Sequence, residues 1–542
     1  MTTSTVQSTS DVCVRVAGLC VSLAKSNAAI VDDVSFELCR GEVLGLVGES
    51  GSGKTTAGLA LMGYTRRGLR ITGGSVHVGG RDILALDDEG LEQVRGRVVA
   101  YVPQDPASAL NPAMKVGPQL REVFAAHPDC LPSGADVEQT VLEVLQAVRL
   151  PDPQRVLRSY PHQLSGGQQQ RVGIAMAFAA RPELIIFDEP TTGLDVTTQR
   201  HFLDTVRRLA AETGVAAVYV SHDLPVVAEL AKQTAVMHKG RIVECGPTQE
   251  IFEHPKDPYT SALIKAIPSV RSAASTDEQR LVGDGPAGRD VALRCAGLTA
   301  RYGARTVLTG VDFTLPAGTC LAVVGESGSG KTTLARSLIG LHPDWTGDVE
   351  LNGGRLAQRS DQRSDTERRV MQYIFQSPYN SLNPRKTVGE ILDAPLRLFY
   401  DVNRTDRVRR INDTLAAVSL GPSFLNKFPH QLSGGQRQRV SLGRALVVEP
   451  SVMICDEITS ALDVSVQAAI LEELRALQAQ RNLSMLFITH DLGVVRSIAQ
   501  NVMVLEGGRV VECGTTEQVL ERPSHPYTQQ LLADIPELRA SA

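Results

Sequence analysis

The sequence has little that would suit it to binding nucleic acid. Only 4% of its residues are aromatic, and it holds a single tryptophan, Trp345. Its 55 basic residues are outnumbered by 60 acidic ones. Proteins that bind nucleic acids stack bases on aromatic rings or neutralise phosphates with a basic surface. We therefore expect no nucleic-acid partner.

Long apolar runs and paired cysteines are also lacking. No uninterrupted apolar stretch approaches the roughly 18 residues of a membrane helix. Residues 1–10 are polar and lack the basic start and apolar centre of a signal peptide. The nine cysteines include no C-x-x-C pair, so neither a disulfide framework nor a zinc ribbon is indicated. We expect reduced thiols in a cytoplasmic setting.

The sequence does contain an internal repeat, in which one module occurs twice. The repeated segments are GESGSGKTT at residues 48–56 and 325–333, PHQLSGGQ at 161–168 and 429–436, SHD at 221–223 with THD at 489–491, and VECG at 243–246 and 511–514. The repeat predicts two whole domains, residues 1–268 and 291–542. A segment rich in Ser, Ala, Gly and charge, residues 269–290, is expected to be a flexible linker.

Each copy follows the same order of elements. A strand-like apolar run leads into the glycine-rich segment, another ends in acidic residues, and a third ends just before a histidine. These runs are residues 42–47, 184–187 and 216–220 in the first copy, and 319–324, 452–455 and 485–488 in the second. Short buried strands alternating with helices predict an α/β fold with a parallel sheet. Such sheets bind ligands at the carboxyl ends of their strands, where these motifs fall.

The glycine-rich segments fit the pattern G-x-x-x-x-G-K-[ST] of a phosphate loop. The glycines let backbone N–H groups converge on phosphate, the lysine reaches the β- and γ-oxygens, and the threonine hydroxyl binds Mg²⁺. A chance glycine-rich turn is the alternative, and two copies that each follow a strand argue against it. The nucleotide-binding residues predicted here are Gly48, Glu49, Ser50, Gly51, Ser52, Gly53, Lys54, Thr55 and Thr56, and Gly325, Glu326, Ser327, Gly328, Ser329, Gly330, Lys331, Thr332 and Thr333.

Carboxylates end the second apolar run of each copy. Asp188 and Asp456 are placed to hold Mg²⁺ together with Thr55 and Thr332. The next residues, Glu189 and Glu457, are candidates to polarise the attacking water. A solvated acidic strand end is the alternative, and the phosphate loop in the same copy favours the catalytic interpretation.

Histidine and glutamine complete each predicted site. His222 and His490 follow the third run and are expected to contact the γ-phosphate. Gln104 and Gln376 each follow a β-like run, and a neutral amide there can contact both Mg²⁺ and the nucleophilic water. Neither residue type indicates function alone, so the repeated context carries both assignments.

The LSGGQ segments predict a second anion site in each copy. Ser165 and Ser433 are followed by Gly-Gly and by expected helices over residues 168–180 and 436–448. A helix start offers a hydroxyl, N–H donors and a favourable dipole to an anion. Because each phosphate loop already serves its own copy, this site suits the nucleotide held by the other copy. An ordinary serine cap is the alternative. The residues are Ser165, Gly166, Gly167 and Gln168, and Ser433, Gly434, Gly435 and Gln436.

On these motifs the chain resembles an ATP-binding cassette (ABC) ATPase with two fused nucleotide-binding domains. The resemblance implies two tandem P-loop NTPase domains, each with a parallel-sheet core, an antiparallel β subdomain and a helical subdomain. It also implies that ATP and Mg²⁺ bind and that ATP is hydrolysed. Two sites would form between the copies, which would be arranged head to tail. In the first site, residues 433–436 would face Lys54, Thr55, Gln104, Asp188, Glu189 and His222. In the second site, residues 165–168 would face Lys331, Thr332, Gln376, Asp456, Glu457 and His490.

A narrower resemblance is to the peptide/nickel import subfamily. Its marks are SALNP at 108–112, SLNP at 381–384, HPKDPYT at 254–260 and HPYT at 525–528. That subfamily imports di- or oligopeptides, glutathione or metal chelates. It implies two integral-membrane permease subunits, contacted after Gln104 and Gln376, an extracytoplasmic substrate-binding protein, and a peripheral place on the cytoplasmic face of the cell membrane.

The chain departs from the family pattern at two points. Family members often stack an aromatic residue on adenine, a role that Tyr302 fits in the second copy, whereas the first copy has Leu23 there. We therefore expect weaker nucleotide binding in the first copy. Some subfamily members carry a cysteine-rich C-terminal segment that holds an iron–sulfur cluster. Residues 269–290 and 529–542 lack cysteine, so no cluster is expected.

Two other functions remain open alternatives. Fused cassettes also act on ribosomes or DNA, but such relatives carry a long charged arm or zinc-type cysteine insertions, which this sequence lacks. Sugar-type importers often have one degraded site, whereas both sites are whole here. The sequence does not specify which solute is carried.

Overall fold

The computed structural model describes residues 12–131, 133–268, 290–377, 381–460 and 462–536. Contacts among these residues group them into two units. Unit 1 holds residues 12–194, 198–266 and 536, and unit 2 holds residues 195–197, 267–268 and the described part of 290–535. The expected linker, apart from Asp290, lies outside the described residues. Within the described ranges, no helix combines the length and the apolar character needed to cross a membrane.

The strands of unit 1 form two sheets. Their bounds are β1 (Val12–Leu23), β2 (Ala29–Cys39), β3 (Val43–Val47), β4 (Leu69–Val78), β5 (Arg81–Asp82), β6 (Val99–Val102), β7 (Leu184–Asp188), β8 (Ala216–Ser221), β9 (Gln233–His238) and β10 (Arg241–Pro247). One sheet is antiparallel, in the order β2-β1-β4-β5. The other runs β10-β9-β3-β8-β7-β6 and is parallel except for β10. Every residue of β3 and β8 is buried, as expected of strands covered on both faces.

Unit 2 repeats this topology. Its strands are β11 (Val291–Tyr302), β12 (Arg305–Pro316), β13 (Cys320–Val324), β14 (Trp345–Leu351), β15 (Gly354–Arg355), β16 (Met371–Ile374), β17 (Val452–Asp456), β18 (Ser484–Ile488), β19 (Asn501–Glu506) and β20 (Arg509–Thr515). The sheet orders are β12-β11-β14-β15 and β16-β17-β18-β13-β19-β20. The six apolar runs predicted as strands agree with β3, β7, β8, β13, β17 and β18 to within one residue at each end.

Two cores lie on opposite faces of the parallel sheet of unit 2. Leu486 and Ile488 of β18 belong to a core shared with the antiparallel sheet and α12. The alternating residues Met485 and Phe487 belong to the core under the helices. This two-residue period sends successive side chains to opposite faces, so one short apolar strand supplies both cores.

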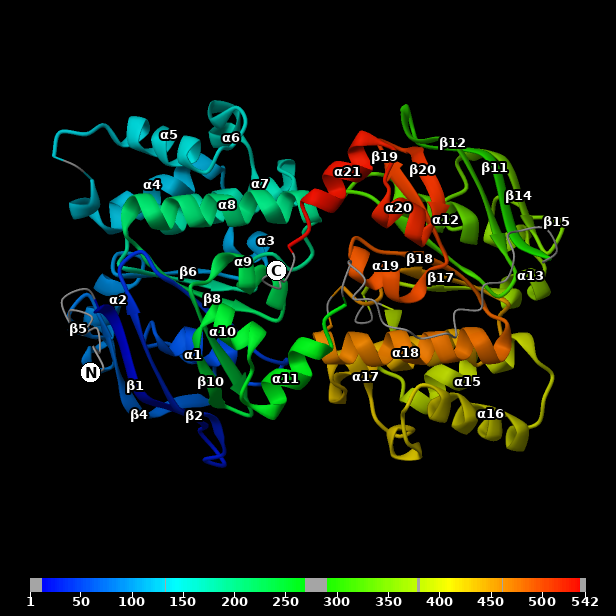
Figure 1. Ribbon diagram of the computed structural model, residues 1–542, viewed down its shortest axis with the longest axis horizontal. Coiled ribbons are helices and arrows are strands. Elements are labelled where there is room, and N and C mark those ends of the chain that lie inside the picture. Colours follow the sequence, from blue (N-terminus) through cyan, green and yellow to red (C-terminus); the bar gives the residue numbers. More distant parts are fainter. Residues whose placement is uncertain (1–11, 132, 269–289, 378–380, 461, 537–542) are drawn as a thin grey trace, which may run out of the picture. The chain divides into compact units, whose positions relative to one another are not determined.

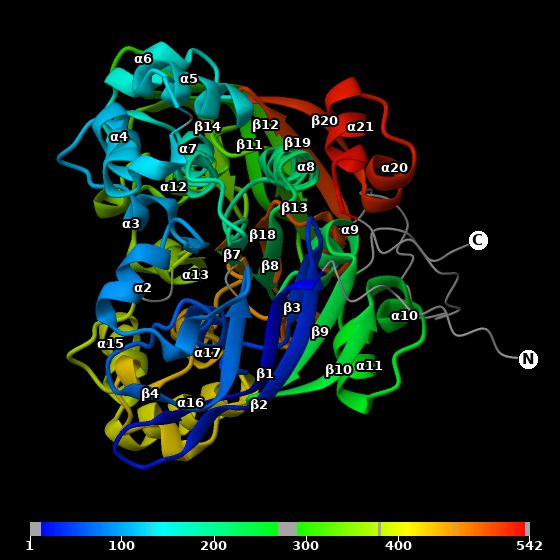
Figure 2. The same cartoon turned by 90° about the vertical axis from the view of Figure 1, so that its left-hand side faces the viewer.

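Helices cover the sheets and build a separate subdomain in each unit. In unit 1 they are α1 (Lys54–Ala60), α2 (Asp88–Val94), α3 (Pro106–Ala109), α4 (Val116–Ala126), α5 (Val137–Ala147), α6 (Pro153–Arg158), α7 (Gly166–Ala179), α8 (Val196–Thr213), α9 (Leu224–Leu230), α10 (Thr248–Glu253) and α11 (Pro258–Lys265). Helices α4, α5 and α6 gather away from β1, β2 and β4 of the same unit, as both views show (Figures 1 and 2).

The helices of unit 2 follow the same plan. They are α12 (Lys331–Ile339), α13 (Asp365–Val370), α15 (Val388–Phe399), α16 (Arg404–Ala417), α17 (Gly434–Leu446), α18 (Val464–Arg481), α19 (Leu492–Ile498), α20 (Thr516–Glu521) and α21 (Pro526–Ala533). The structure confirms the predicted α/β class, with a parallel-sheet core, an antiparallel sheet and a helical subdomain in each copy.

The helices after LSGGQ were predicted to begin at residues 168 and 436, and this is wrong by two residues. They begin at Gly166 and Gly434. The cause is the preceding serine, which caps each helix, so the two glycines already form its first turn.

Candidate functional site

The phosphate loop of unit 1 joins β3 to α1. Lys54, at the first position of α1, is 5% exposed. Its Nζ donates hydrogen bonds to the carbonyl oxygens of Gly48 and Glu49, at 2.7 and 2.8 Å. The lysine charge is therefore held inside the curve of the loop, where phosphate oxygens would bind.

Asp188, at the carboxyl end of β7, lies against this loop. The Thr55 hydroxyl donates to its Oδ1 at 2.9 Å, and the Tyr101 hydroxyl donates to its Oδ2 at 2.7 Å. Both carboxylate oxygens are thus fixed, one by α1 and one by β6. Asp188 itself is 4% exposed.

Glu189 turns away from its strand into the site. Its φ of 47° is left-handed, and its N–H donates to the Val220 carbonyl at the end of β8. The Glu189 carboxylate accepts from Gln104 Nε2 at 3.0 Å and lies 3.2 Å from His222 Nδ1. Burial alone would raise the pKa of Glu189, but the hydrogen bond and charge of His222 bring it below its usual value.

The same geometry recurs at the phosphate loop of unit 2. Lys331 Nζ donates to the carbonyls of Gly325 and Glu326 at 2.7 and 2.8 Å. Asp456 accepts from the Thr332 hydroxyl at 3.3 Å and from the Tyr373 hydroxyl at 2.6 Å. Burial lowers the pKa of Lys331, as for an ammonium group withdrawn from water.

Glu457 occupies the place of Glu189. It has a φ of 49°, accepts from Gln376 Nε2 at 2.6 Å, and lies 3.7 Å from His490 Nδ1. Burial opposes ionisation of both partners, but their mutual attraction lowers the pKa of Glu457 and raises that of His490. The pair therefore favours an ionised glutamate at neutral pH, which suits a group that orients water.

The side chains predicted to bind Mg²⁺ fit that ion chemically. Hydroxyl, carboxylate and amide oxygens are the hard donors that Mg²⁺ prefers. Burial raises the pKa of Asp456, so a bound cation would stabilise its charged form. The residues that would hold it are Thr55, Gln104 and Asp188 in unit 1, and Thr332, Gln376 and Asp456 in unit 2.

The LSGGQ serines cap the helices that follow them. The Ser165 hydroxyl accepts from the Gln168 N–H at 3.3 Å, and the Gln168 side chain accepts from the Ser165 N–H at 3.0 Å. Ser433 and Gln436 form the same reciprocal pair. The cap that was the alternative interpretation is present in both units. Binding of the other copy's nucleotide stays a prediction.

The two residues compared for adenine stacking hold equivalent places, Leu23 at the end of β1 and Tyr302 at the end of β11. Tyr302 is 48% exposed, and its ring stacks on His342 at 4.2 Å between centroids. An exposed, flat ring of this kind can accept an adenine.

Sequence reasoning missed Tyr101 and Tyr373. Each side chain orients the predicted metal-binding carboxylate of its own unit. A signal was available, because both copies place tyrosine three residues before the predicted glutamine.

Comparisons with known proteins bear on both units. A family model described as ABC transporter matches residues 31–192 and 308–460. A second, described as the C-terminal region of oligopeptide/dipeptide transporters, matches residues 243–296 and 511–542.

Among individual proteins, the chain is 40% identical to the glutathione import ATP-binding protein GsiA of Shigella dysenteriae, over 94% of this chain and 86% of that protein. It is 39% identical to GsiA of Escherichia coli K12 with the same coverage. A solved structure of cbiO1 from Clostridium perfringens, part of the ABC transporter complex cbiONQ, aligns with 25% identity and a TM-score of 0.40. The alignment covers 43% of this chain and 92% of that one.

Proposed function

The chain belongs to the ABC transporter family, as a fused pair of ATP-binding domains of the oligopeptide/dipeptide type, and we propose that its importer carries small peptides. Glutathione, a tripeptide, is the first candidate because the similar proteins named above are glutathione import ATP-binding proteins. The matches to the two family models confirm the family resemblance drawn from the sequence motifs. ATP-binding proteins of this family are ATPases that drive transport through membrane permease components.

The observation that carries the ATPase role within this proposal is the presence of two whole sites. Each unit holds lysine, threonine, aspartate, glutamate, glutamine and histidine in the same arrangement of hydrogen bonds and charged contacts. In each, the lysine binds the terminal phosphates of ATP, and the ionised glutamate orients a water molecule for attack. The histidine and glutamine hold that glutamate in place. Bound Mg²⁺ supplies positive charge that offsets charge on the phosphates.

We place the LSGGQ segments opposite the nucleotide of the other copy. The capped helix start at Ser165 or Ser433 supplies N–H donors and a positive dipole end, which attract phosphate. With nucleotide between, the two halves would be drawn together, and hydrolysis would release them. The cycle would drive two permease subunits from the cytoplasmic face of the membrane, with an extracytoplasmic binding protein delivering the peptide.

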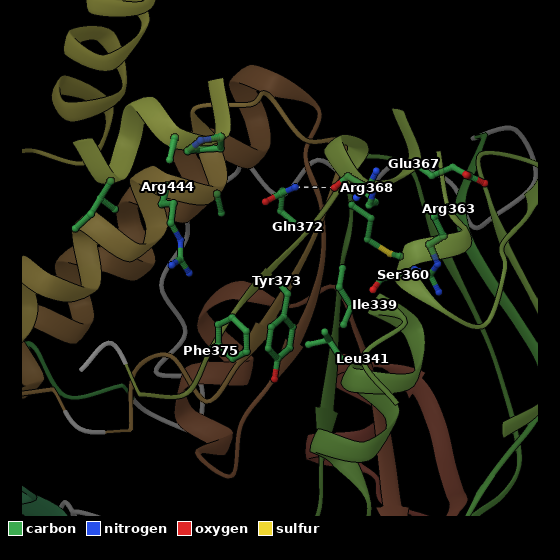
Figure 3. A pocket seen from close by; sticks show the side chains of 15 residues that line it. Ile339, Leu341, Ser360, Arg363, Glu367, Arg368, Gln372, Tyr373, Phe375 and Arg444 are labelled. Carbon is green, nitrogen blue, oxygen red and sulfur yellow. Dashed lines mark hydrogen bonds between the residues drawn. The ribbon is translucent and has the colours of Figure 1, made fainter. Parts of the chain in front are cut away.

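A groove in unit 2 supports contact with the permease. It has a volume of about 400 Å³ and lies between α13, β16 and helices α15 and α17 (Figure 3). Its apolar wall includes Leu341 and Phe375, which are 53% and 37% exposed, and Arg444 points in from α17. Tyr373 lines it and donates to Asp456. A permease segment bound there would therefore lie against Tyr373, which contacts the predicted metal ligand Asp456.

The experiment that tests the ATPase assignment replaces both glutamates. We expect the full chain with Glu189→Gln and Glu457→Gln to retain ATP while hydrolysis falls by at least about a hundredfold. Glu212→Gln, at an exposed glutamate of α8 paired with Arg208, is the control and should hydrolyse ATP normally. Undiminished turnover in the double variant would overturn the assignment.

A second experiment addresses partner and cargo. When the tagged chain is purified from detergent, two integral-membrane proteins should purify with it. The Phe375→Ser variant should bind these proteins more weakly, because Phe375 lines the groove. The control Leu398→Ser, at an exposed residue outside the groove, should bind them normally. Sedimentation with ribosomes instead would favour the alternative function. In proteoliposomes, labelled glutathione and dipeptides should accumulate in preference to nickel chelates or sugars.

A further inference from the structure

The C-terminal segment of each copy reaches back to its own phosphate loop. Tyr259, in α11, accepts a hydrogen bond through its hydroxyl from the Glu49 N–H at 3.1 Å. Tyr527, in α21, accepts from the Glu326 N–H at 2.9 Å. The contact occurs in both copies, so it is a property of the repeated domain.

The peptide group that each tyrosine contacts also contacts the phosphate-binding lysine. The Glu326 N–H and the Gly325 carbonyl belong to one planar trans peptide group, so they point in opposite directions. The tyrosine holds the N–H side, while Lys331 Nζ donates to the carbonyl side at 2.7 Å. In unit 1 the Gly48–Glu49 peptide lies in the same way between Tyr259 and Lys54.

Carboxylates fix the segment that carries each tyrosine. In unit 2, Glu512 of β20 accepts from the backbone N–H groups of Ser524 and His525 at 2.8 and 3.2 Å. In unit 1, Glu244 of β10 does the same for Lys256 and Asp257 at 2.8 and 3.1 Å.

Neighbouring groups fix the position of the Tyr259 side chain, and burial keeps the Tyr527 hydroxyl protonated. Asp257 caps α11 by accepting from the Tyr259 N–H at 2.8 Å, and the Tyr259 ring packs on His238 at 4.0 Å between centroids. Helices α10 and α11 lie beside β10 in both views (Figures 1 and 2). Burial raises the pKa of Tyr527 to about 12, so its hydroxyl stays neutral at physiological pH. The hydroxyl is thus a fixed acceptor behind the loop.

We propose that Tyr259 and Tyr527 are positioning residues that orient the first peptide group of each phosphate loop, and thereby the lysine that binds phosphate. The C-terminal segments then set the nucleotide affinity of each unit. This inference rests on the proposed function, because it takes ATP to be the ligand of these loops.

The test removes the hydroxyl and keeps the ring. In the full chain, Tyr527→Phe should raise the Kd of a fluorescent ATP analogue at one of the two sites about three- to tenfold, as expected for one lost hydrogen bond. The KM for ATP should rise with it, while kcat stays within about twofold and the thermal midpoint without nucleotide falls no further than in the control variant described next. Adding Tyr259→Phe should extend the loss of affinity to both sites.

The matched control is Tyr400→Phe. The Tyr400 hydroxyl accepts from Arg369 and donates to the Val448 carbonyl, both at 2.9 Å, so this change also removes partly buried hydrogen bonds in unit 2. It should leave nucleotide affinity at the wild-type value. Wild-type affinity in Tyr527→Phe, or a parallel fall in kcat and thermal midpoint, would overturn the proposal.

A readout without nucleotide separates this proposal from the proposed function. In the nucleotide-free chain, Tyr527→Phe should speed amide hydrogen exchange in residues 325–331 and leave residues 48–54 unaffected. A wild-type chain that binds no ATP would defeat the proposed function, whereas unchanged exchange at residues 325–331 would defeat the positioning role.

Discussion

Single residues set the shape of each phosphate loop. Gly48 and Gly325 have φ of 146° and 149°, a region that side chains rarely enter. A Cβ on Gly48 would lie 2.2 Å from the Met237 carbonyl oxygen, and one on Gly325 would lie 2.2 Å from that of Leu505. Both the backbone angle and the space therefore require glycine.

We expect Gly325→Ala to destabilise unit 2 by at least about 1–3 kcal/mol and to abolish nucleotide binding there, because the loop must move away from β19. Thermal unfolding and nucleotide titration measure this. Gly173→Ala, in the middle of α7 with open space around its Cβ, should be neutral or stabilising. Normal binding in Gly325→Ala would contradict the argument.

The residues at the ends of β1 and β11 predict unequal nucleotide affinity. Stacking on an aromatic ring stabilises a base by about 1–3 kcal/mol. We therefore expect Tyr302→Ala to weaken binding in unit 2 about tenfold, and Leu23→Tyr to strengthen it in unit 1. Titration with ATP on variants that lack the other phosphate-loop lysine measures each site. Equal affinities at the two wild-type sites would refute the prediction.

At the scale of elements, the strands were predictable and the turns between them were not. Buried parallel strands are short apolar runs, so β3, β7 and β8 could be located from the runs of apolar residues in the sequence. The left-handed turn at Glu189 and Glu457 has no comparable signal, since it depends on an N–H that reaches the next strand. The contact between Tyr527 and Glu326 links residues far apart in the chain, which local patterns do not encode.

The link between β20 and α21 predicts a pH dependence. Burial opposes the charge on Glu512, but N–H and hydroxyl donors around Ser524 hold the pKa of Glu512 below its usual value. A lowered folded-state pKa adds stability above the ordinary glutamate pKa of about 4.3, and this is lost as pH falls through the folded value. We expect Glu512→Gln to lower the thermal midpoint at about pH 7 and to have a smaller effect near pH 4. An effect that grows on acidification would contradict this.

At the scale of the whole molecule, two similar sites in one chain predict that a ligand stabilises both units. A ligand that binds only the folded state stabilises it in proportion to the logarithm of its concentration. We expect ATP with Mg²⁺ to raise the thermal midpoint of both units in the Glu189→Gln, Glu457→Gln chain, and EDTA to remove most of the gain. ATP alone stabilising as much as ATP with Mg²⁺ would argue against the predicted metal ligands.

Joining both copies in a single polypeptide also has a consequence for assembly. Because one messenger yields one copy of each half, the cell makes the Tyr302-bearing and Leu23-bearing halves in equal number without separate control of their synthesis. Mutations that make the halves unlike can then accumulate, since neither half has to recognise a freely diffusing twin.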